Sequence, residues 1–365
     1  IGGVSKFPDD KKAPGEVTDC KNGYPDTTFG LTKRPGFKYI KSFGSSETEY
    51  NNSKWFHIHR DGDETYIGCI KPKVGGTNGS ITIWNAKTGV EITSGSGLTV
   101  TSPAGDYLTG EKIVDYDILT IQDTTIITNK IKTVAMSAAP SFTARSQGTV
   151  RIKQVINSTA YTAKINSTSC TFTSDTSATL QEVVDGLAAA IQTKIDDNTL
   201  SGLTVSKQRD SLELVKTAAF TLTVSAGTDD TPISSYQDAV PNITYLPDHS
   251  KNGRVVQIFQ TAQITEDDYY VKFVADDSTS GFGHWVETVA PNVSASLDTT
   301  SMPHELINTG VNTFTFRPIS WEDRLVGDDT TNNQPSFIGK KIEQCFFYSN
   351  RLGLLSADKR PNLLL

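Results

Sequence analysis

The feature that most constrains this fold is the short spacing of turn-forming residues. Thr, Ser, Asn, Asp and Gly recur every few residues and separate short stretches in which apolar and polar residues alternate. This alternation is typical of strands with one buried face, and the turn residues mark where each strand ends. The sequence therefore predicts a mainly β protein, with clear strands at residues 66–70, 80–85, 118–121, 125–129, 255–259, 270–274, 285–289 and 313–317.

Residues 148–235 have a different sequence pattern, with a helical period between strand-like alternations. This pattern predicts a small α+β insertion of two strands, a helix and three strands. Thr179 followed by Glu182 forms a capping-box start, and residues 196–198 are expected to end the helix in a turn. Between them, apolar residues recur at spacings of three and four and form one stripe that must pack on a sheet. The stripe consists of Leu180, Val183, Val184, Leu187, Ala188, Ile191 and Ile195.

The length of 365 residues exceeds one ordinary domain. We therefore predict three regions: a β-rich N-terminal region at 1–147, the α+β insertion at 148–235 and a second β-rich region at 236–365. The short strands suit sheets arranged either like propeller blades or as a sandwich, and the pattern does not distinguish these two arrangements.

Composition and charge exclude several classes of protein. Apolar residues make up 36% of the chain and charged residues 21%, so the chain is neither disordered nor a membrane protein. The longest apolar runs, at residues 118–121 and 134–136, are far shorter than a bilayer span. The N-terminus lacks the pattern of a secretory signal peptide. A net charge of −7 argues against a nucleic-acid clamp, so any DNA is expected to be passed rather than gripped.

The cysteines and histidines do not form a recognised metal or redox motif. Cys20, Cys69, Cys170 and Cys345 are scattered without a CxxC pair, and we interpret them as reduced, buried, small hydrophobic residues. His57 and His59 lie on the same face of one predicted strand. Without a third ligand they indicate a polar strand face rather than a metal site.

Enzyme signatures are also absent from the sequence. It contains no GxSxG, GxGxxG, HExxH or phosphate-binding loop motif. The paired acids at residues 267–268 and 276–277 have the residue type of glycosidase carboxylates, but neighbouring acids are more often solvated turn residues. We therefore predict no enzyme activity and no catalytic, metal-binding or cofactor-binding residue.

Two blocks of sequence carry a specific resemblance to a known family. Near the start stand GGVS (2–5), CKNGYPD (20–26), FGL (29–31) and RPG (34–36). Near the end stand MPHEL (302–306), FTF (314–316), WEDRLVGDD (321–329), PSFIG (335–339) and FFYSNRLGLLS (346–356). In order and spacing these blocks resemble tail tubular protein B, the tail nozzle proteins of short-tailed podoviruses of the Autographiviridae type.

Most of the matched residues have a physical role in a scaffold. Pro in the YPD and RPG turns fixes φ, and the adjacent Gly tolerates a positive φ. Arg351 is expected to bond carbonyls or an acid near a buried turn, with a subunit contact as the alternative. Asp328 and Asp329 are interpreted as a polar loop in preference to a cation site.

The resemblance implies a structural subunit of a phage tail. It implies a ring of six copies beneath the portal-adaptor complex, contacts with a tail adaptor protein of the tail tubular protein A type, attached tail fibres, and viral DNA passing through the lumen without sequence-specific binding. The protein would assemble in the bacterial cytoplasm and reside in the virion tail, without a cofactor or membrane insertion.

The resemblance also implies a role for each of the three regions. Region 1–147 becomes platform-like, 148–235 a docking module for fibres or another partner, and 236–365 the start of a propeller-like part. Because family members continue beyond the last block, we expect this third part to be truncated. The rival reading is a receptor-binding or polysaccharide-binding tail adhesin, which would instead show repeated β-helix coils or aromatic sugar sites.

Overall fold

The computed structural model describes residues 2–26, 28–43, 50–101, 104–228, 230–259, 268–356 and 361–363. The prediction of a mainly β protein is confirmed. All eight strands named from the sequence are present, with ends that differ by up to five residues. The described sheets contain from two to nine strands, unlike the equal blades of a propeller, because strands distant in the sequence pair with one another.

The largest sheet has nine strands and joins the middle of the chain to a later segment. It curls until its edge strands lie close together, and it encloses a core rich in isoleucine and aromatic side chains. Strands from residues 304–318 complete it, and the pairing between β25 and β9 is parallel. In spatial order the strands are β10 (Tyr116–Ile121), β11 (Thr124–Asn129), β24 (His304–Gly310), β25 (Thr313–Pro318), β9 (Gly97–Val100), β8 (Glu91–Ser94), β7 (Ser80–Asn85), β6 (Thr65–Lys71) and β5 (Lys54–His59).

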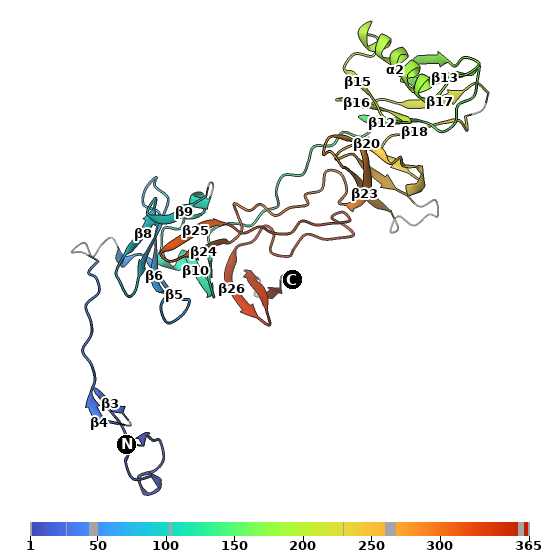
Figure 1. Ribbon diagram of the computed structural model, residues 1–365. Helices are drawn as coiled ribbons and strands as arrows, with labels where there is room; N and C mark the ends of the chain where they lie inside the picture. Colours follow the sequence, from blue (N-terminus) through green and yellow to red (C-terminus); the bar gives the residue numbers. More distant parts are fainter. Residues whose placement is uncertain are drawn as a thin grey trace.

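The α+β unit forms at the opposite end of the molecule (Figure 1). Its helix, α2 (Leu180–Asp196), packs on β14 and β15, and the predicted capping box between Thr179 and Glu182 is confirmed. The strands β14 and β18 add to the predicted set. One sheet contains β15 (Leu203–Lys207), β16 (Ser211–Lys216), β12 (Gln147–Ile152) and β18 (Ile233–Tyr236), and the other contains β14 (Thr168–Thr173), β13 (Ala160–Ile165) and β17 (Leu222–Ala226).

Beside this unit lies a five-stranded sheet, and a further small sheet lies near the C-terminal end of the described chain. The first contains β19 (Ala239–Val240), β21 (Val255–Ile258), β22 (Tyr269–Ala275), β23 (Ser280–Thr288) and β20 (His249–Lys251). The second contains β26 (Ile342–Tyr348), β27 (Arg351–Ser356) and β28 (Pro361–Leu363). Short 3-10 turns occur at η1 (Asp9–Lys11), η2 (Ala104–Tyr107), η3 (Ile113–Asp115) and η4 (Ile243–Tyr245).

Residues 2–39, which we call the arm, extend away from the nine-stranded sheet (Figure 1). The arm contains two small sheets joined by short turns, and an extended stretch leads from them to the rest of the molecule. The sheets pair β1 (Gly3–Val4) with β2 (Glu16–Val17), and β3 (Gly23–Asp26) with β4 (Gly30–Lys33).

The division into regions 1–147, 148–235 and 236–365 stays a prediction, because sheet membership does not test independent folding. Strands β24 and β25 of the third range belong to the nine-stranded sheet of the first. No helix among the described residues is long and apolar enough to cross a membrane.

Candidate functional site

Three irregular segments, at residues 130–146, 289–303 and 319–341, run between the nine-stranded sheet and the far end of the molecule (Figure 1). We call them the neck. Backbone hydrogen bonds join them in pairs: Ser137 N donates to Ser296 O at 2.9 Å, Arg324 N donates to Ala295 O at 2.9 Å, and Val134 N donates to Lys340 O at 2.9 Å. The neck is thus a three-segment structure held together without regular sheet.

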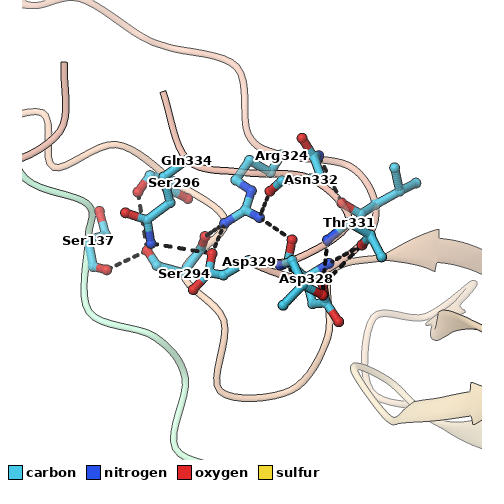
Figure 2. Close-up of polar contacts among 11 residues, drawn as sticks. Ser137, Ser294, Ser296, Arg324, Asp328, Asp329, Thr331, Asn332 and Gln334 are labelled. Carbon is cyan, nitrogen blue, oxygen red and sulfur yellow. Dashed lines mark hydrogen bonds and ion pairs between the residues drawn. The ribbon is translucent and has the colours of Figure 1, made fainter. Parts of the chain in front are cut away.

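Arg324 is the central side chain of the neck (Figure 2). Its guanidinium donates to Ser294 O at 3.2 Å, to the carboxylate of Asp329 at 2.8 Å and to Asp328 O at 2.9 Å, and also to Asn332 O. A planar guanidinium offers five donors in a fixed geometry, so one arginine can satisfy several carbonyls of an irregular loop. Arg324 therefore closes its own loop and ties it to the segment at residues 289–303.

Asp328 fixes the turn that follows Arg324. Its Oδ1 accepts hydrogen bonds from the backbone N–H groups of Thr330 and Thr331 at 2.8 Å each, and from both hydroxyl groups. The hydrogen bonds from Thr330 and Thr331 hold the pKa of the Asp328 carboxyl well below its usual range. These are the hydrogen bonds of a polar loop, and the preference for a loop over a cation site stays a prediction.

The role predicted for Arg351 is filled by Arg324. Arg351 is exposed, and its side chain makes no hydrogen bond or ion pair with a described residue. It lines a cavity of about 360 Å³ together with Trp321, Glu322 and Leu352. The predicted bonding role of Arg351 was wrong, because the loop carbonyls gather around Arg324 instead. The alternative, a subunit contact of Arg351, stays a prediction.

A second polar centre, missed by the sequence analysis, joins the α+β unit to the five-stranded sheet. Glu213 on β16 accepts hydrogen bonds from Arg254 at 3.0 Å, from Ser250 at 2.8 Å and from Thr149 at 3.1 Å. The side chains of Glu213 and Arg254 are each only 1% exposed. The sequence feature that could have indicated this centre is Glu213 itself, a single charged residue between Leu212 and Leu214 in a strand. Both leucines are buried.

The other residues considered from sequence occupy ordinary structural positions. His57 and His59 are exposed on one face of β5, which confirms the polar strand face. Asp277 accepts from the backbone of Thr279 and Ser280 in a turn. Asp268 accepts from Gln257, and Asp267 lies outside the described residues. Among described residues, no three His, Cys, Asp or Glu side chains gather as metal ligands.

The cysteines are free, as predicted. Cys69, Cys170 and Cys345 are buried as predicted, whereas the prediction was wrong for Cys20, which is half-buried. Burial raises the pKa of the Cys345 thiol to about 12, although the hydroxyl of Thr128 lies 3.0 Å from its sulfur.

Comparison with known proteins identifies the family of the chain. The profile of a family described as bacteriophage nozzle protein matches residues 1–360. The chain is 25% identical over 372 aligned residues to tail tubular protein gp12 of Escherichia phage T7, and the match covers 98% of this chain and 44% of that protein. The chain thus spans less than half the length of this curated relative. Because the family match covers nearly every residue, the chain belongs to the bacteriophage nozzle protein family.

Proposed function

We propose that this chain is a structural subunit of a short phage tail, in which six copies form a ring-shaped channel for DNA ejection. The observation that carries the proposal is the family match over residues 1–360. A heterologous contact repeated around an axis closes into a ring when the rotation between copies fits. The elongated form of the subunit suits such an assembly, because most of its length remains available for contacts with neighbours (Figure 1).

The charge of the chain supports a passive conduit for DNA. With 34 Lys and Arg against 41 Asp and Glu, the chain has too little positive charge to neutralise a duplex along a channel. A lumen of neutral or negative character repels phosphates and lets the duplex slide. The role therefore needs neither sequence-specific binding nor enzyme activity nor a cofactor.

The α+β unit suits the docking of tail fibres. It stands at the end of the molecule farthest from the nine-stranded sheet (Figure 1). The buried pair of Glu213 and Arg254 fixes it to the five-stranded sheet, and Gln237 adds hydrogen bonds to the carbonyls of Gln147 and Phe220. A projecting unit held rigidly at its base can transmit a pull from a fibre to the ring.

At the other end, the ring would contact a tail adaptor protein of the tail tubular protein A type. The neck supports this division of roles, because it links the nine-stranded sheet to the far end through three bonded segments instead of one flexible linker. The subunit would assemble in the bacterial cytoplasm and reside in the virion tail.

Negative-stain electron microscopy and mass photometry of the purified chain, alone and mixed with the adaptor protein of the same phage, test the proposal. Rings that form alone or on the adaptor are the expected result. A monomer or compact trimer that ignores the adaptor and binds host polysaccharide would instead establish an adhesin.

A further inference from the structure

The arm, residues 2–39, lies apart from the rest of its own chain. None of its described residues is buried, and their hydrogen bonds are made within the arm, such as Gly2 N to Gly15 O and Arg34 N to Asn22 O, both at 2.9 Å. Its large apolar side chains face outward, with Phe37 91% and Tyr39 77% exposed. Phe7, Tyr24, Phe29 and Leu31 are also more than half exposed.

The two small sheets of the arm should not be stable in water without something that covers them. Two-stranded sheets are marginal in water unless a further strand or an apolar surface covers them. The arm has two such sheets, β1–β2 and β3–β4, and the described residues provide no core beneath either. Several large apolar side chains exposed on one short segment indicate an interaction site.

The base of the arm is fixed, whereas the arm itself is not. Lys41 pairs with Glu91 at 2.7 Å, and Ile40 and Lys41 lie against Gly89. Phe43 packs edge-on against Trp84 with ring centroids 4.7 Å apart. Residues 34–39 lead outward from this anchor, and six extended residues span about 20 Å. The arm is thus held at a defined point and directed away from its own subunit (Figure 1).

The charge of the arm indicates what covers it. The arm carries seven Lys and Arg against five Asp and Glu, whereas the whole chain carries 34 against 41. The remainder of the chain therefore has a clear excess of acid. Lys33, Arg34 and Lys38 stand beside Phe37 and Tyr39 with no acidic residue among them. A basic and aromatic segment complements an acidic protein surface, and such complementarity fixes partner and register.

We propose that the arm of each subunit packs on a neighbouring copy of this same chain and links adjacent subunits. Each copy supplies both a basic, apolar arm and an acidic body, so one contact repeats from subunit to subunit. The inference rests on the proposed ring because it requires copies placed side by side.

DNA is the weaker candidate for the partner of the arm. Phosphate contacts use the Lys and Arg side chains and leave aliphatic groups such as Val4 and Leu31, both more than half exposed, in water. Aromatic rings can stack on single-stranded bases, but that mode does not account for the exposed faces of both small sheets. A protein surface covers the aliphatic, aromatic and basic groups together.

Photocrosslinking of the full chain tests the proposal. The chain is made with p-benzoylphenylalanine in place of Phe37, as an equal mixture of ¹⁵N-labelled and unlabelled copies, and irradiated with and without short duplex DNA. Crosslinked peptides that join labelled to unlabelled chains, between residue 37 and residues beyond 50, are expected. Crosslinks confined to a single chain, or crosslinks to DNA in place of protein, overturn the proposal.

Assembly of variants gives a second measurement. The double substitution Phe37→Ser and Tyr39→Ser removes side chains that touch nothing buried, so the subunit should fold, and self-association should weaken by at least about tenfold. The matched control replaces the exposed aromatics Tyr245→Ser and Tyr348→Ser, which lie outside the arm, and should associate like the wild type.

The outcomes separate the two proposals. If the arm variant and the wild type form rings equally well, the arm does not link subunits, while the nozzle function stands. If the wild type fails to associate both alone and on the adaptor, the arm contact and the ring are overturned together.

Discussion

The carboxylate of Glu213 accepts a hydrogen bond of 3.0 Å from the guanidinium of Arg254, with both side chains 1% exposed. The two residues are 41 positions apart and join the α+β unit to the five-stranded sheet. Arg254 also donates to Gln237 O at 2.9 Å and lies over the ring of Tyr236. This network fixes how the proposed fibre-docking unit stands on the molecule.

Removing the charge of Glu213 should loosen this junction. Glu213→Gln leaves the Arg254 guanidinium buried without a counter-charge, which costs about 3 kcal/mol. Hydrogen exchange measured by mass spectrometry should show faster exchange in β16 and at residues 250–258, with β13 and α2 less affected. Asp185→Asn, which breaks the exposed pair with Lys207, is the matched control and should change little. Equal protection in both variants would contradict the assigned role.

Replacing Arg324 by lysine should destabilise the neck. A lysine ammonium cannot reach four acceptors in the planar arrangement that the guanidinium uses, so Arg324→Lys should destabilise the loop by about 2 kcal/mol. Exchange at residues 324–334 and 289–296 should accelerate. The control is Arg317→Lys, because Arg317 is 53% exposed in its pair with Glu305. Equal protection of this loop from hydrogen exchange in both variants would show that Arg324 does not hold the neck segments together.

Gly353 in the last motif block is needed for packing. A Cβ at this position would lie 2.2 Å from Cζ of Phe346, which covers the glycine across the β26–β27 pair. Gly353→Ala must displace the ring, at a cost of about 1 to 3 kcal/mol. Thermal unfolding should show a lower Tm, whereas Gly62→Ala, in open space, should leave the Tm unchanged. Similar Tm values for both variants would refute the packing argument.

His304 should make stability depend on pH. Burial lowers the pKa of His304 from 6.5 to about 4, and the ring stacks on Tyr107 at 4.0 Å. Below pH 6.5 the unfolded chain takes up a proton that the folded chain accepts only near pH 4. The contribution of the neutral ring to the free energy of unfolding is therefore fully present above pH 6.5. As the pH falls toward 4, up to about 3 kcal/mol of it is lost.

Chemical denaturation between pH 7.5 and 4 measures this loss. His304→Gln removes the titrating group, so the variant should lose less stability than the wild type over the same range. Parallel pH profiles for the two proteins would show that His304 does not titrate as assigned. His59, which is exposed, provides the matched control as His59→Gln.

Much of the local structure follows from the sequence alone. Strand positions, the capping box at Thr179 and the buried stripe of α2 depend on residues within one turn or a few positions of each other. The polar loop at Asp328 likewise follows from local turn chemistry. Family membership was also within reach, because motif order is a property of the linear chain.

Only the tertiary structure decided which distant segments meet. Periodicity marks residues 304–318 as strands, but it does not reveal that they complete a sheet begun at residue 54. The sequence led us to expect bonded carbonyls at Arg351, whereas the folded neck gathers its carbonyls around Arg324. The sequence likewise shows Glu213 as a charged residue within a strand, but it does not reveal that Arg254 is its partner. Local patterns reflect the preferences of neighbouring residues, whereas these pairings depend on the free energy of burying surfaces far apart in the chain.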